Sequence, residues 1–127
     1  MVRLRYADVK TFKLVARDVV ELMVEYDRDL RKILIWLLGG SRGGEMRLRI
    51  LLLLKKRPMN PNQLARLLNV NYRTVIHHLD VLERNGLVVR MSRDYGAPYF
   101  ISEMLEKNWD VLKNVVRILG LNETGEG

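Results

Sequence analysis

The side chains with the clearest chemical potential lie in residues 72–85, whose spacing predicts a helix. Val75, Leu79 and Leu82 recur at three- and four-residue intervals and predict its buried stripe. The outward face at the N-terminal end then carries Tyr72, Arg73, Ile76 and His77. An arginine can pair with O6 and N7 of guanine, and an isoleucine can contact a thymine methyl group. We therefore predict that these four side chains read bases in the major groove of DNA.

Two of these positions also have simpler interpretations. Ile76 is equally compatible with packing between helices. The neighbouring His77 and His78 invite comparison with a metal site, but adjacent helical residues point about 100° apart. The sequence has no other histidine and no cysteine. We therefore predict no metal, no cofactor and no disulfide, and because no nucleophile and base occur at usable spacing, we predict no catalytic residue and no enzyme.

Cations and polar side chains around this helix predict contacts with DNA phosphates. The predicted set is Asn71, Thr74, Arg42, Lys55, Lys56, Arg57, Arg90, Arg93 and Tyr95. Thr74 could instead support the helix cap, and the cations at 55–57 also suit the negative end of a helix dipole. The acidic Asp94 next to Arg93 makes a phosphate contact by this loop less favourable.

Two helices in tandem would position these side chains. Asn60 can cap the first, with Pro61 at its first position and Gln63 placed to complete a capping box. Asn71 can cap the second, and Gly86 can end it, because a residue without Cβ adopts the left-handed conformation easily. Leu64, Leu67 and Leu68 are predicted to form the apolar face of the first helix.

The pattern changes from helix to strand after Gly86. Leu87, Val89 and Met91 alternate with Val88, Arg90 and Ser92, and a second apolar run follows at 99–101. Residues 93–98 contain glycine and proline and predict the connecting loop. The order helix, helix, hairpin is that of a winged helix-turn-helix.

These segments resemble the ArsR-like winged helix-turn-helix transcription regulators, particularly their archaeal members. The resemblance covers about half of the chain and rests on residues 47–51, 58–65 and 74–88. It implies a mainly α fold with a small β-hairpin wing (α+β) that binds double-stranded DNA. In that family the position of His77 often contacts DNA, whereas that of His78 packs near the protein body. The cysteine or carboxylate and histidine ligands of the metal-sensing members have no counterpart here.

Charge follows the predicted DNA-binding region. The net charge of the chain is +7, and residues 42–101 carry eleven basic and four acidic side chains. DNA phosphates attract such a surface in a strongly salt-dependent way. A solvated basic surface is the simpler alternative, although it does not explain why the charge follows the motif.

The terminal segments predict helices with broad apolar faces that need partners. They could bury each other within one chain, but the resemblance implies a homodimer that presents two recognition helices to two half-sites. The residues assigned to dimerisation are Phe12, Val19, Met23, Tyr26, Leu30, Ile33 and Leu37, followed by Leu105, Trp109, Leu112, Val116 and Leu119.

The predicted organisation has five parts. An N-terminal helix (1–38) is followed by a glycine-rich joint (39–44), the winged helix (45–101), a C-terminal helix (102–121) that Ser102 can cap, and a disordered tail (122–127). Ser41 could alternatively cap the next helix and bring the amides of Gly43 and Gly44 towards a phosphate.

The predicted function is that of a sequence-specific transcription regulator, and occlusion of promoter DNA would make it a repressor. An architectural or non-specific DNA-binding protein is one alternative, and a winged-helix module that binds other proteins is another. A small-molecule effector could lie between the terminal helices, near Trp36 and Trp109. The apolar runs are too short to cross a membrane, and the expected location is the cytoplasm, in association with the nucleoid.

Overall fold

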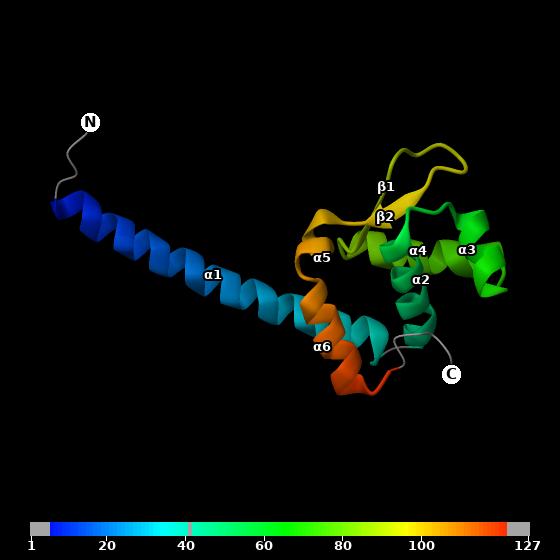
Figure 1. The fold of residues 1–127 in the computed structure, drawn as a ribbon, viewed down its shortest axis with the longest axis horizontal. Coiled ribbons are helices and arrows are strands. Elements are labelled where there is room, and N and C mark those ends of the chain that lie inside the picture. Colours follow the sequence, from blue (N-terminus) through cyan, green and yellow to red (C-terminus); the bar gives the residue numbers. More distant parts are fainter. Residues whose placement is uncertain (1–5, 41, 122–127) are drawn as a thin grey trace.

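The computed structural model describes residues 6–40 and 42–121, without the side chains of residues 6–17 and 23–26. The predictions for Phe12, Met23, Tyr26, Ser41 and the tail fall outside this part. The elements are α1 (Tyr6–Leu38), α2 (Gly44–Lys56), α3 (Pro61–Leu68), α4 (Tyr72–Arg84), β1 (Val88–Arg90), β2 (Tyr99–Ile101), α5 (Glu103–Lys107) and α6 (Trp109–Leu119) (Figure 1). The predicted fold class, mainly helical with a small hairpin, is confirmed.

The two helices of the helix-turn-helix begin at the predicted caps. The backbone N–H of Gln63 donates to Asn60 Oδ1, and that of Asn60 donates to Gln63 Oε1, each at 2.8 Å. Asn71 Oδ1 accepts from the backbone N–H of Arg73 at 2.8 Å. Gly86 has φ of +73°, which suits a residue without Cβ at the end of α4. Local side-chain chemistry therefore sets the boundaries of both helices.

The base of the wing is hydrogen-bonded to Met59, a contact that the sequence did not predict. β1 and β2 are antiparallel, with Arg90 opposite Tyr99. Met59 exchanges both backbone hydrogen bonds with Tyr99, at 3.1 and 2.8 Å. The hairpin turns Val88 inward, whereas Val89 and Met91 are exposed, and the regular strand covers only residues 88–90. The alternation predicted for residues 87–92 thus extends beyond the strand.

The core lies where α2, α4 and the C-terminal end of α1 meet. Val75, Leu79 and Leu82 of α4 are fully buried, as predicted. Leu64 of α3 is buried as well, whereas Leu67, on the predicted apolar face of the same helix, is 58% exposed. A helix of eight residues presents only a narrow stripe to its neighbours.

The terminal helices pack against each other at one end of α1. Five residues predicted to lie in a dimer interface are buried within the single chain: Leu30, Leu37, Leu105, Leu112 and Val116. Their part in a dimer stays a prediction. The C-terminal helix is also interrupted at Asn108, so that α5 and α6 replace one predicted helix. Its predicted cap is present, because Ser102 Oγ accepts from the backbone N–H of Leu105 at 3.2 Å. None of the described helices is both long and apolar enough to span a membrane.

Candidate nucleic-acid interface

A hollow of about 230 Å³ separates α4 from the wing, and we call it the wing hollow. Five residues predicted to contact DNA line it together: Tyr72, Ile76, Arg90, Arg93 and Tyr95. They come from the N-terminal half of α4, from the end of β1 and from the loop between β1 and β2.

An aromatic contact links the two walls of the wing hollow. The rings of Tyr72 and Tyr95 lie 6.3 Å apart, centroid to centroid, with their planes inclined by 40°. Asn62 Nδ2 of α3 donates to the hydroxyl oxygen of Tyr95 at 3.2 Å. Sequence reasoning missed Asn62, because only the fold brings the second residue of α3 beside the wing. The contact orients an exposed tyrosine that can donate to a phosphate or a sugar.

Arg90 is held by the protein body. Its Nε lies 3.3 Å from Glu83 Oε2, and its guanidinium carbon lies 5.9 Å from the ring centroid of Tyr99. Burial raises the pKa of the Tyr99 phenol above its ordinary value of 10.0, against the lowering effect of Arg90. Arg90 is therefore partly neutralised at the base of the wing, whereas Arg93, nearer the tip, is exposed. Of the two, Arg93 is better placed to meet a phosphate.

Other residues predicted to contact DNA lie at the N-terminal end of α4 and are exposed to solvent. The side chains of Asn71, Arg73, Thr74 and His77 are all exposed, while His78 is buried. Arg73 contributes only its backbone N–H to the cap, so the cap does not occupy its guanidinium. The exposed end of α4 and the wing hollow adjoin through Tyr72 and Ile76.

Some of the predicted phosphate contacts are not gathered at this surface. Lys55 pairs with the carboxylate of Glu106 and lies 4.8 Å from the ring centroid of Trp109. Lys55 and Lys56 line a different groove, which shares no residue with the wing hollow. Arg57 is exposed just after α2. Arg42 is also exposed, and its carbonyl oxygen accepts a hydrogen bond from Arg47.

Arg47 forms a buried junction that joins α1, the glycine-rich loop and α4. Only 4% of this residue is exposed. Its Nε donates to the carbonyl oxygen of Leu37 at 2.8 Å, its Nη2 to that of Arg42 at 3.2 Å, and its Nη1 lies 3.3 Å from His78 Nδ1. A buried polar group is retained at low cost only when it is hydrogen-bonded, as here. The junction fixes α4 relative to the end of α1.

The junction also makes stability depend on pH. Burial, then Arg47 and His77, lower the pKa of His78 below its ordinary value of 6.5. Below that pH the unfolded chain takes up a proton that the native imidazole does not, so the unfolded state binds more protons. We expect the free energy of unfolding to fall as the pH drops from 7.5 to 5.5, measured by urea titration. His78→Gln should flatten this slope, and His77→Gln should flatten it far less, because His77 is the last of the three causes. Equal slopes in the His78→Gln protein and the unmodified protein would contradict the assignment.

Solved structures of other proteins share this fold. The transcriptional regulator HlyU from Vibrio vulnificus is 17% identical, with a TM-score of 0.54 over 81% of this chain and 96% of its own. The transcriptional repressor BigR from Xylella fastidiosa is 18% identical, with a TM-score of 0.55 over 79% and 92%. At this identity the likeness establishes the fold, which is a winged helix. A comparison with curated protein sequences gives no match.

The sequence itself supplies the family. Residues 38–112 match the family described as "Methanogenesis regulatory protein FilR1, N-terminal domain". The matched region runs from the end of α1 through the helix-turn-helix and the wing into α6. The closer kinship with ArsR-like regulators stays a prediction. The chain belongs to the family of the FilR1 N-terminal domain.

Proposed function

We propose that this protein is a sequence-specific, double-stranded DNA-binding transcription regulator that acts as a homodimer. The N-terminal end of α4 enters the major groove, where Arg73, Ile76 and His77 face base edges. Residues 90–98 of the wing lie on the flanking backbone or minor groove. Occupation of promoter DNA makes it a repressor.

One observation carries this proposal: the wing hollow and the exposed start of α4 form one surface. Tyr72 and Ile76 belong to both, and Arg73 and His77 continue it along the helix. Basic and aromatic side chains on a convex helix next to a wing are suited to a groove and its phosphates. The regulatory name of the family, and the regulator and repressor names of HlyU and BigR, support the same function.

Exposed apolar side chains support the homodimer. Val19 and Leu22 on α1 are 47% and 64% exposed, and Trp36 and Ile118 are 59% and 62% exposed. Apolar patches of this kind mark association surfaces. Two recognition helices would then meet two half-sites one helical turn apart, about 34 Å.

Selection from a random-sequence DNA library at near-physiological salt tests this function. We expect an enriched inverted repeat, and we expect Arg73→Ala to relax the preference at one position of each half-site by about 1–3 kcal/mol. His77→Ala should alter the preference in the same half-site. Arg66→Ala, an exposed arginine of α3, is the matched control and should select the same sequence as the unmodified protein.

The same selection separates the alternatives. Binding without enrichment would indicate an architectural protein, because phosphate contacts carry no sequence information. No binding even at low salt would indicate a winged helix that contacts other proteins.

A further inference from the structure

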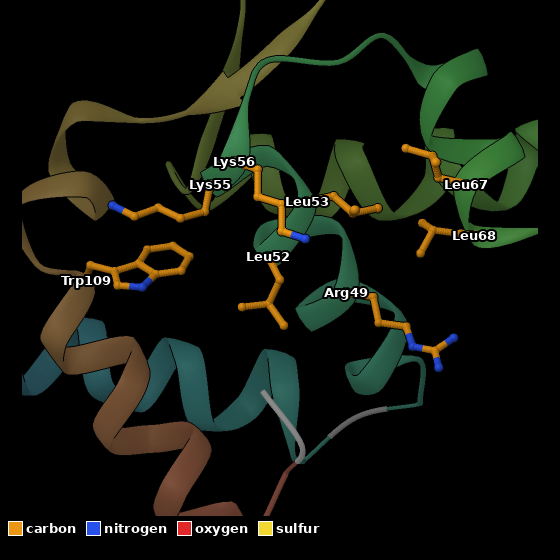
Figure 2. A pocket seen from close by; sticks show the side chains of 8 residues that line it. All are labelled: Arg49, Leu52, Leu53, Lys55, Lys56, Leu67, Leu68 and Trp109. Carbon is orange, nitrogen blue, oxygen red and sulfur yellow. The ribbon is translucent and has the colours of Figure 1, made fainter. Parts of the chain in front are cut away.

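A second groove, outside the proposed DNA surface, crosses α2, α3 and the start of α6. It encloses about 650 Å³. Its apolar lining consists of Leu52, Leu53, Leu67, Leu68 and Trp109 (Figure 2). Leu67, one of these residues, is 58% exposed. We call this the basic-apolar groove.

Cations border the same groove. Arg49, Lys55 and Lys56 of α2 contribute to its lining, and Figure 2 shows all three along that helix. Lys55 and Lys56 are both exposed to solvent. Lys55 also forms an ion pair with Glu106 and lies over the ring of Trp109. An occupant should therefore combine apolar side chains with negative charge.

One segment of this chain has that chemistry. Residues 18–29 of α1 contain five acidic side chains and one basic side chain. Asp18, Glu21 and Asp29 are spaced so that they lie along one side of the helix. Val19 and Leu22 form an apolar stripe directly beside them. The segment is an acidic, amphipathic helix.

This segment lies beyond the part of α1 that packs within its own chain. α1 has 33 residues, about 50 Å, whereas α6 has 11 residues, about 16 Å, so α1 projects well past its partner helix (Figure 1). The apolar stripe is buried at Leu30, Leu34 and Leu37 but exposed at Val19 and Leu22. The described side chains at 18–22 and 27–29 are all exposed.

We propose that residues 18–29 of α1 from a second copy of the chain dock in the basic-apolar groove, and that the exchange is reciprocal across a twofold axis. Val19 and Leu22 would cover the leucines and Trp109, and the acidic stripe would face Arg49, Lys55 and Lys56. Pairing of one α1 segment with the same segment of the other copy would instead bring two acidic stripes together, which is repulsive. This inference rests on the proposed homodimer and specifies its geometry.

Cysteine cross-linking tests the contact directly, because the chain has no cysteine of its own. A Leu22→Cys chain is mixed with an affinity-tagged Leu67→Cys chain and oxidised mildly. We expect a disulfide-linked heterodimer on a non-reducing gel as the main product. Val20→Cys is the matched control: Val20 is 58% exposed but lies about 200° around the helix from Leu22, and it should cross-link far less. A dominant Leu22–Leu22 product would overturn the proposal.

Charge reversal provides the second test, by sedimentation equilibrium at low salt. Asp18→Lys with Glu21→Lys should weaken the dimer at least about tenfold, and so should Arg49→Glu with Lys56→Glu, because each reversal acts twice in a twofold dimer. The four changes together should restore the affinity to within about threefold. Asp27→Lys, on another side of α1, should leave it unchanged. A stable dimer that ignores all these changes would refute the docking but keep the homodimer, whereas a monomeric unmodified chain would refute both.

Discussion

Replacing Gly44 with alanine should destabilise the protein more than the same change at any other glycine that the structure describes. A Cβ at this position would lie 2.1 Å from the carbonyl oxygen of Leu38 and 2.5 Å from its carbonyl carbon. Both atoms are backbone, so no side-chain rotation can relieve the clash, and the start of α2 must move away from the end of α1. We expect a loss of at least about 3 kcal/mol in the free energy of unfolding, measured by urea titration.

Gly40→Ala is the matched control in the same loop. Its added Cβ would find its nearest atom, Trp36 Cα, at 3.4 Å, which is close to an ordinary contact. We expect a change within about 1 kcal/mol, since alanine also restricts the unfolded chain. A Gly44→Ala protein as stable as Gly40→Ala would show that α1 and α2 are not packed as closely as described.

Arg47→Met should produce the second large effect. The methionine fills much of the same space, but the carbonyl oxygens of Leu37 and Arg42 and Nδ1 of His78 lose a buried donor. We expect a loss of about 2–4 kcal/mol of stability at pH 7.5. Removal of the nearby positive charge should also raise the pKa of His78, so that less stability is lost between pH 7.5 and 5.5.

The exposed Arg66 supplies the control for this substitution. Arg66→Met should change the stability by less than about 0.5 kcal/mol and should leave the pH dependence as it is. Equal stability of the Arg47→Met protein and the unmodified protein would mean that the junction does not join α1 to α4.

Local chemistry explains why the helix-turn-helix could be predicted closely. The caps at Asn60 and Asn71 and the stop at Gly86 depend on residues no more than three positions away. The buried stripe of Val75, Leu79 and Leu82 follows from helical periodicity alone. Such features are present in the sequence before any tertiary contact forms.

Long-range contacts explain what could not be predicted. The pairing of Met59 with Tyr99 spans forty residues, and no local sequence pattern predicts it. In the sequence Arg47 looks like any other basic residue. Only the folded chain brings it into hydrogen-bond distance of Leu37, Arg42 and His78. The candidate DNA surface shows the same division: periodicity indicates which way Arg73 faces, but only the folded wing brings Asn62 to Tyr95.

The bridge between Met59 and Tyr99 has a consequence for motion. An isolated two-stranded hairpin is marginal in water, but this one shares hydrogen bonds with the residue that precedes the cap of α3. Amide hydrogens of Met59 and Tyr99 should exchange with solvent only when the whole domain opens, whereas those at residues 92–96 should exchange in local fluctuations. The tip of the wing can then adjust to grooves of different width while its base keeps a constant position beside α3.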